Sequence, residues 1–470
     1  MTDPANQVTN VRIQDLVEQA LSLSTADGCI VLGEERTEAN LRWAGNSLTT
    51  NGQMQSRSIT VISTVTGAEG TSVGVVSRAV SQPDELPDLV SASEQAARSA
   101  APADDAAPLI EPYPNDDDWS ALPAATTIEV FTDFAPALGT AFAEAKAAGL
   151  LLYGFAEHIV TATFLASSTG LRRRWDQPTG RLELNGKSAD LARSAWVGAQ
   201  TKDFSDVDVP ALTAELSIRL GWALNRIDLP AGRYETILPA GAIADLLIYA
   251  YWTASARDAE EGRNVFAAGE GKTKIGQRLT DLPLTLRSDP AERGMECTPF
   301  EVAVSSMGGM QSVFDNGAQI DPTEWLSQGT LSNLVRSRSW AARDNAEHVP
   351  LVDNLILDGG GTKDLQEMIA STERGLLLTC LWYIREVDPQ TLLLTGLTRD
   401  GVYLIENGKV VGAVNNFRFN ESPIDLLGRI IEVGRTERCL CREWNDYFTR
   451  TAMPPVRVAD FNMSTVSQAS

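Results

Sequence analysis

Apolar and polar positions follow their most regular pattern near the middle of the chain, in residues 234–262. A short run rich in branched and aromatic residues, YETIL, is followed by Pro239 and three small residues. Apolar side chains then recur at spacings of three and four, at Ile243, Leu246, Leu247, Ala250, Tyr251 and Ala254. That spacing places them on one face of a helix, and Gly262 can take the left-handed conformation that often follows a helix end. The pattern therefore predicts a strand, a turn and a buried central helix.

The N-terminal part of the chain predicts helices that cover a sheet. Amphipathic stretches at residues 11–24 and 86–100 predict two helices. Runs rich in branched residues predict short strands at Cys29–Gly33, Leu41–Ala44, Ser58–Val65 and Thr71–Ser77. Turn signals, Asn51-Gly52 and residues 67–70, separate these runs, so we expect a meander.

Residues 101–123 differ from the rest in composition. They carry prolines at 102, 108, 112 and 114 and the acidic run Asp116–Asp118. A segment of this kind buries too little apolar surface to form a core, so it predicts an extended loop over the surface. Adjacent carboxylates on a loop do not converge on one ion, and the acidic run predicts a solvated segment rather than a metal site.

A second combination of helices and strands follows the loop. An alanine-rich helix is predicted at Phe134–Gly149, and two strands are predicted within residues 150–167, on either side of Gly154. A further strand pair is expected around turns at Gly180 and Asn185-Gly186, before a helix at Ala211–Asn225. Pro230 and Gly232 interrupt any continuation of that helix, so residues 225–233 predict a domain boundary.

The C-terminal half is rich in predicted strands. They lie at Leu282–Leu286, Phe300–Ser305, Asn354–Leu357, Gly375–Ile384, Gly401–Glu406 and Lys409–Val414. Asn407-Gly408 is a strong signal for a two-residue hairpin between the last two of these strands. Asp358 and the three glycines after it predict a turn into a helix at Lys363–Thr372, rather than an anion-binding nest.

Together these elements predict an α+β protein. We expect an N-terminal α/β region of helices on mostly antiparallel sheets, then a β-rich C-terminal domain with a barrel-like or half-closed sheet around the central helix. The expected divisions are residues 1–100, the loop at 101–123, a second N-terminal segment at 124–227 and the C-terminal domain at 228–470.

Composition excludes several classes of function. The 470 residues are 43% hydrophobic with a formal charge of −23, which indicates a folded protein that repels nucleic acid. The longest apolar runs fall short of the roughly 18 residues of a membrane span. Residues 1–10 lack the features of a secretion signal, and the five cysteines include no C-x-x-C pair. We therefore expect a cytoplasmic protein with free thiols.

The chain offers few candidate residues for chemistry. Residues 267–273, AAGEGKT, do not form a phosphate loop, because Phe266 stands where the first glycine of that motif is needed. His158 lies in an apolar strand and His348 in a polar loop, and two isolated histidines do not form a zinc site. Cys439 and Cys441, flanked by Arg438 and Arg442, are candidate nucleophiles because neighbouring cations can lower a thiol pKa.

The order of motifs over nearly the whole chain resembles the TldD/PmbA (TldD/TldE) family of zinc-dependent peptidases. The resemblance rests on LRWAGNS, the strand, turn and Leu-Leu helix near residue 240, and then NLILDGGGTKDLQEMI, GVYLIENGKVVGAVNNFRFNES and PPVRVADF. In zinc-binding members, H-E-x-x-x-H follows the Leu-Leu pair. Those motif positions fall here on Ile248, Tyr249 and Thr253, none of which supplies a usual zinc ligand. The family's C-terminal cysteine ligand falls near Cys441.

The resemblance implies a PmbA/TldE-type chain that holds no zinc itself. Such a chain would pair with a TldD-type subunit, which carries the zinc, in a heterodimer that cleaves unfolded peptides. The positions of the missing motif would face the shared cavity, and Cys441 would be a remnant ligand. Two alternatives remain open: a stand-alone, homodimeric peptide-binding or assembly module with no peptidase partner, and an independent hydrolase that uses Cys439 or Cys441.

Overall fold

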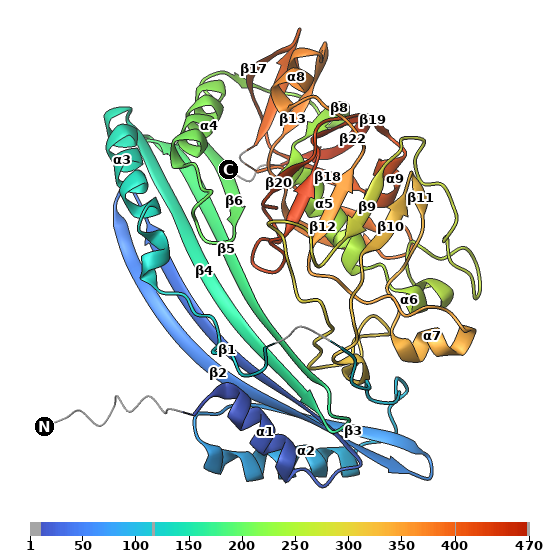
Figure 1. Cartoon of the computed structure of the whole chain (residues 1–470). Helices are drawn as coiled ribbons and strands as arrows, with labels where there is room; N and C mark the ends of the chain where they lie inside the picture. Colours follow the sequence, from blue (N-terminus) through green and yellow to red (C-terminus); the bar gives the residue numbers. More distant parts are fainter. Residues whose placement is uncertain (1–10, 115–117, 400, 468–470) are drawn as a thin grey trace, which may run out of the picture.

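The N-terminal half is built on one long, curved antiparallel sheet. The computed structural model describes residues 11–114, 118–399 and 401–467. In the sheet the strand order is β3-β2-β1-β4-β5-β6, and every neighbouring pair is antiparallel. Its strands are β1 (Gly28–Trp43), β2 (Leu48–Gly67), β3 (Gly70–Ala79), β4 (Leu150–Ser167), β5 (Arg172–Ser188) and β6 (Ser194–Thr201). Figure 1 shows this sheet curving around one side of the β-rich C-terminal half.

Helices cover the two ends of the curved sheet. At one end lie α1 (Ile13–Leu23) and α2 (Leu86–Ser99), and at the other lie α3 (Phe134–Ala147) and α4 (Val209–Trp222) (Figure 1). Each pair buries its apolar face in a separate core against the strands. The helices predicted at residues 11–24, 86–100, 134–149 and 211–225 are therefore present, with ends within a few residues of those expected.

The predicted strand breaks are wrong, because four strands run for 16 to 20 residues without a turn. Asn51-Gly52, Gly154, Gly180 and Asn185-Gly186 all lie inside strands. At Gly154 a Cβ atom would lie 2.4 Å from the ring of Trp43, so glycine is needed there for close packing and not for a turn. Typical strands have about 3–10 residues, and a sequence prediction tuned to that length divides these long strands.

Two open sheets form the C-terminal half. One has the order β14-β15-β18-β22-β8-β13-β16-β17-β7, with β19 paired to β22, and the other has the order β11-β10-β9-β12-β21-β20. The first contains β7 (Arg226–Ile227), β8 (Gly232–Leu238), β13 (Arg374–Leu378), β14 (Trp382–Asp388), β15 (Leu393–Leu397), β16 (Val402–Glu406), β17 (Lys409–Val414), β18 (Phe417–Glu421), β19 (Ile430–Val433) and β22 (Val456–Val466). The second contains β9 (Thr285–Ser288), β10 (Thr323–Ser327), β11 (Thr330–Leu331), β12 (Leu355–Asp358), β20 (Glu437–Cys439) and β21 (Thr451–Met453). The α+β class is confirmed, with sheets that do not close into a barrel.

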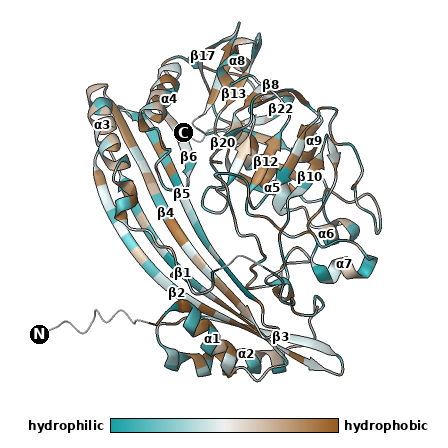
Figure 2. Ribbon diagram, viewed as in Figure 1, coloured by the Kyte–Doolittle hydropathy of each residue, from teal (hydrophilic) through white to brown (hydrophobic). Residues whose placement is uncertain are grey.

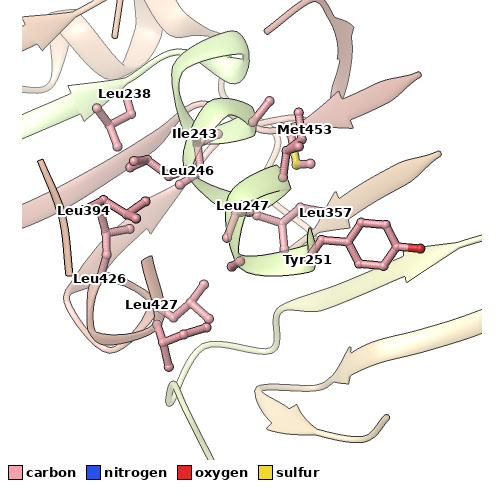
Figure 3. Close-up of a cluster of buried hydrophobic side chains, with 14 of the residues drawn as sticks. Leu238, Ile243, Leu246, Leu247, Tyr251, Leu357, Leu394, Leu426, Leu427 and Met453 are labelled. Atoms are coloured by element: carbon pink, nitrogen blue, oxygen red, sulfur yellow. The ribbon is translucent and has the colours of Figure 1, made fainter. Parts of the chain in front are cut away.

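The central helix α5 (Ala240–Trp252) lies between these two sheets. Figure 3 shows Leu246 directed toward Leu394 of β15, while Leu247 lies near Met453 of β21. Figure 2 shows that hydrophobic residues gather around this helix. Ten of its thirteen residues are buried, so its burial extends round the helix rather than along one stripe.

Other parts of the C-terminal half differ from the prediction in detail. The helical pattern breaks after Trp252, and a separate helix α6 (Ala256–Glu260) ends before Gly262, whose φ is +73°. Residues 300–305 form no strand, and the run predicted at 375–384 is divided between β13 and β14. The hairpin at Asn407-Gly408 and the turn before α8 (Leu365–Ala370) are confirmed. The remaining helices are α7 (Arg338–Asp344) and α9 (Pro423–Leu427), with 3₁₀ turns at Pro83–Glu85, Ile128–Phe131 and Val313–Asp315.

The proline-rich segment is extended, as predicted, but it packs more closely than expected. Leu109 and Ile110 pack against a core that includes residues of both halves of the chain. The Tyr113 hydroxyl donates a hydrogen bond to the carbonyl of Gly317 at 2.8 Å, and Arg338 donates to the carbonyl of Pro108. The segment therefore joins the two halves. Of the acidic run, Asp118 is exposed and bonded to Ser120, whereas Asp116 and Asp117 lie outside the described residues.

No helix within the described ranges is both long enough and apolar enough to cross a membrane.

Candidate functional site

The three positions of the missing zinc motif lie at the C-terminal end of α5. The Ile248 side chain is fully buried in the main core. Tyr249 is half-buried, and its ring lies 5.6 Å from that of Trp444. Thr253 follows the helix, and its hydroxyl is close to the carbonyls of Tyr249 and Ala250, at 3.2 and 3.1 Å. A hydrocarbon, a phenol and a hydroxyl bonded to the backbone offer no usual ligand set for zinc.

The start of α5 is shaped by a close approach of the chain near Leu440. Pro239 precedes the helix with an extended ψ of 165°, so the helix begins at Ala240. A Cβ atom on Gly241 would lie 2.6 Å from the carbonyl oxygen of Leu440. Only glycine therefore allows the C-terminal segment to lie against the first turn of α5.

A buried carboxylate holds the same C-terminal segment against the middle of α5. Asp245 has no exposed surface, and it accepts hydrogen bonds from the backbone N–H groups of Arg442 and Glu443 at 3.1 and 2.8 Å. The indole N–H of Trp444 donates to the Asp245 carbonyl at 2.8 Å. Burial raises the pKa of Asp245 to about 8, against the opposing effect of the two N–H donors. Asp245 was not among the predicted site residues. Its one indication in the sequence is that it is an acidic residue inside an otherwise apolar helix.

Cys441 is brought next to α5 by this segment, but as a buried thiol. Its Sγ is 3.3 Å from the carbonyl oxygen of Phe448, and burial raises its pKa well above the usual value. Burial likewise raises the pKa of Cys439 to about 12. The expectation that the flanking arginines lower these thiol pKa values is therefore wrong. A thiol with a raised pKa holds little thiolate near neutral pH, and the thiolate is both the nucleophile and the metal ligand.

The two arginines that flank the cysteines have other partners. Arg438 pairs with Asp206 at 2.8 Å, and Arg442 pairs with Glu183 of β5 at 3.1 Å. The Arg442 guanidinium also lies over the ring of Trp382, 4.2 Å from its centroid. These contacts tie the segment at residues 438–450 to the curved sheet as well as to α5.

Further contacts confirm that the 438–450 segment lies between the two halves of the molecule. The amide of Gln200 in β6 donates to the carbonyl of Cys439 at 2.9 Å. Arg181 of β5 pairs with Glu157 at 3.0 Å and also with Asp446. Any change in the angle between the halves would therefore move residues that contact α5.

Aromatic rings gather where α5 ends. Trp252 lies 5.4 Å from Trp444 and 6.3 Å from Phe448, measured between ring centroids. A cavity of about 460 Å³ opens beside them, with Trp252, Phe448 and the 76% exposed Tyr447 in its lining. Apolar cavities lined by aromatic side chains are typical binding sites for ligands or for side chains of a partner. Near α5 the walls of this cavity carry aromatic side chains and no zinc ligand set. This end of the cavity is therefore suited to binding rather than to zinc chemistry.

The match to a known family decides the identity of the C-terminal half. Residues 231–465 match the family described as the PmbA/TldA metallopeptidase C-terminal domain, and this is half of the chain. The chain belongs to the TldD/PmbA family. The resemblance drawn from the sequence motifs is thereby confirmed. Comparison with curated proteins gives no match.

Solved structures share the fold over nearly the whole of this chain. The crystal structure of TldE from Thermococcus kodakarensis is similar with a TM-score of 0.78 at 14% identity, covering 96% of this chain and 99% of that one. A protein described as a candidate modulator of DNA gyrase from Thermotoga maritima has a TM-score of 0.74 at 15% identity, with coverage of 96% and 99%. A similarly described protein from Bacteroides thetaiotaomicron has a TM-score of 0.73 at 14% identity, with coverage of 96% and 98%.

The two histidines of this TldD/PmbA-family chain lie in different surroundings. His158 is a buried and satisfied strand residue, as expected, with Nδ1 2.7 Å from the Thr126 hydroxyl and Nε2 2.7 Å from the carbonyl of Lys202. His348 is not isolated, contrary to expectation, because it lies beside the carboxylates of Glu301 and Asp315. No spacing in the sequence indicated that group, because its members come from three separate segments.

Proposed function

We propose that this chain is the non-catalytic, TldE-type subunit of a zinc metallopeptidase that cleaves unfolded peptides. A TldD-type subunit carrying H-E-x-x-x-H would form a heterodimer with it and hold the catalytic zinc. Membership of the TldD/PmbA family and the fold shared with the archaeal TldE support the proposal.

The observation that carries the proposal is the chemistry of α5. In this family position 248 would be the first histidine of the motif, and here it is an isoleucine with 0% exposure. Tyr249 would replace the catalytic glutamate, and a phenol does not serve as the carboxylate base that activates a zinc-bound water. A buried thiol at Cys441 does not complete a ligand set by itself.

Peptide would reach the shared site along surfaces that this chain supplies. β14 is an edge strand of the larger C-terminal sheet, and its Tyr383 and Val387 side chains are both 56% exposed. An extended peptide can add to such an edge through backbone hydrogen bonds.

The absence of a C-x-x-C pair and the burial of four of the five cysteines support a reducing, cytoplasmic location.

Reconstitution tests this function. The chain is co-expressed with a TldD-type subunit from the same genome, and cleavage of an unfolded peptide is measured for each chain alone and for the pair. We expect chelator-sensitive cleavage by the pair only, abolished when the partner's motif glutamate is changed to glutamine. Cleavage by this chain alone, lost on Cys439→Ser or Cys441→Ser, would instead establish the hydrolase alternative.

The stand-alone binding module is the other outcome of this experiment. In that case no TldD-type subunit copurifies, the mixed chains show no cleavage, and this chain alone, as a monomer or homodimer, still binds unfolded peptide. Size-exclusion chromatography with light scattering separates these states, since a heterodimer, a homodimer and a monomer differ in mass.

A further inference from the structure

A group of three metal-ligating side chains borders the cavity beside α5. Glu301, Asp315 and His348 each offer one ligand atom, and these atoms lie within 4.8 Å of one another. The Glu301 and Asp315 side chains are 3% and 0% exposed, and that of His348 is 18% exposed. Glu301 also lines the cavity that borders Trp252.

The two atoms that face each other in this group have no hydrogen-bond partner beyond one another. Oε2 of Glu301 and Nε2 of His348 are both buried, and within the described structure neither bonds to a third group. They lie 3.4 Å apart. A buried polar atom without a close partner destabilises the fold, so two such atoms facing each other suit a cation that both can coordinate.

The separation of His348 Nε2 and Glu301 Oε2 suits two ligands of one ion better than a closed ion pair. A protonated imidazole and a carboxylate normally close to about 2.7–2.9 Å. Two ligands bound tetrahedrally to zinc at about 2.0–2.1 Å lie about 3.4 Å apart. The separation of His348 Nε2 is 3.4 Å from Glu301 and 3.8 Å from Oδ2 of Asp315.

Neighbouring groups fix the carboxylate of Asp315 and the backbone of Glu301. Asp315 accepts hydrogen bonds from Nε of Arg338 at Oδ1, at 2.8 Å, and from the backbone N–H of Arg338 at Oδ2, at 3.1 Å. The backbone of Glu301 bonds to Ala318 and Gly317 at 2.8 and 2.9 Å. Each carboxylate keeps a lone pair for an ion, and the support from neighbouring groups resembles the outer shell that orients metal ligands in proteins.

We propose that Glu301, Asp315 and His348 form a binding site for a divalent first-row metal ion, with zinc as the ion best suited to one imidazole and two carboxylates. Three protein ligands leave a coordination position for water, and the cavity beside Glu301 gives access to it. The bound ion links the loop after α7 to the segment that packs on the curved sheet. This site is separate from the motif positions on α5, so the proposed peptidase role stands whether or not the metal binds.

Zinc retention by the full-length chain tests the site. The protein is stripped with a chelator, dialysed against micromolar zinc and analysed for metal content, and the affinity is measured by competition with a chromogenic chelator. We expect one zinc per chain and a higher thermal midpoint with zinc than without it, since binding to the folded state stabilises it. Loss of a metal ligand in His348→Gln or Glu301→Gln should weaken the zinc affinity by more than about 100-fold, which exceeds the effect typical of changing a group that only orients a ligand.

Two control variants complete the design. Glu347→Gln changes the exposed carboxylate next to His348, and Cys441→Ser changes the remnant position near α5. Both should keep the zinc. Failure of the wild-type chain to retain zinc would overturn the proposal and leave an ordinary ion pair, and so would zinc that is lost in Cys441→Ser but kept in His348→Gln. If circular dichroism shows His348→Gln to be unfolded, the isosteric Glu301→Gln variant and the wild-type zinc content decide.

Discussion

Replacing Ile248 with histidine tests whether this position faces the core or a solvent-filled site. The side chain is fully buried, so the exchange removes about 1.5–3 kcal/mol of favourable burial. A histidine ring there would leave polar nitrogens without partners, at a further cost of about 1–3 kcal/mol. The sum is roughly 2.5–6 kcal/mol, a large part of the 5–15 kcal/mol that stabilises a typical domain.

Urea unfolding followed by tryptophan fluorescence measures this loss. Ile248→Val is the matched control, because it keeps the side chain apolar and should cost only about 0.5–1.5 kcal/mol. Tyr249→His is a second control, at a half-buried neighbour. An Ile248→His variant that unfolds within about 1 kcal/mol of the wild type, and whose midpoint rises with zinc by more than the wild-type midpoint does, would refute the placement of Ile248 in the core.

Restoring the whole H-E-x-x-x-H motif on α5 is limited by the geometry of the helix. Ile248→His, Tyr249→Glu and Thr253→His together place two histidines five residues apart, which is about 140° round a straight helix. That angle is too wide for one ion, and α5 ends at Trp252, before the second histidine. We expect at most weak additional zinc binding and no peptidase activity, measured against a Tyr249→Glu single variant.

Three further predictions follow from individual contacts. Burial lowers the pKa of His158 in the folded protein. The stability that the neutral ring contributes should therefore be fully present above the unfolded pKa of about 6.5, and it should be lost as the pH falls through the lower folded pKa. In His158→Gln, the urea midpoint of unfolding should depend less on pH over this range. Gly241→Ala should destabilise by about 1–3 kcal/mol through its clash, whereas Gly139→Ala, with open space in α3, should stabilise by up to about 1 kcal/mol. Replacing residues 103–113 by a short linker should lower the thermal midpoint by several degrees, because Tyr113 and its neighbours pack between the halves. An unchanged midpoint would show that these contacts contribute little to stability.

Local signals in the sequence predicted some elements well and others poorly, for identifiable reasons. Asn407-Gly408 determined a hairpin because two consecutive residues with positive φ are needed there, and both have it. Gly154 carried the same kind of signal but is a packing glycine beneath Trp43. A single sequence does not distinguish these uses, since one depends on the backbone and the other on a residue more than a hundred positions away.

In the candidate site, too, some residues could be located from the sequence and others could not. The motif positions on α5 came from the resemblance to the TldD/PmbA family, and membership of that family is shown by the match over residues 231–465. The correspondence of these positions with the family's motif stays a prediction. Asp245 and the group around His348 did not follow, because their partners come from distant segments: Asp245 bonds to Arg442, and His348 lies beside Glu301. Burial, which determines the pKa of the Cys439 thiol, likewise arises only when these segments meet.

The position of β22 in its sheet sets an order of events during synthesis. β22 is the last strand along the chain, yet it lies between β18 and β8 and pairs with both. The curved sheet needs only residues up to Thr201, so it can form while the ribosome is still making the rest. The larger C-terminal sheet must wait for Val456–Val466, and until then β8 presents an unpaired edge beside the apolar α5. The nascent chain therefore has a late interval in which this half is exposed to aggregation and most in need of a chaperone.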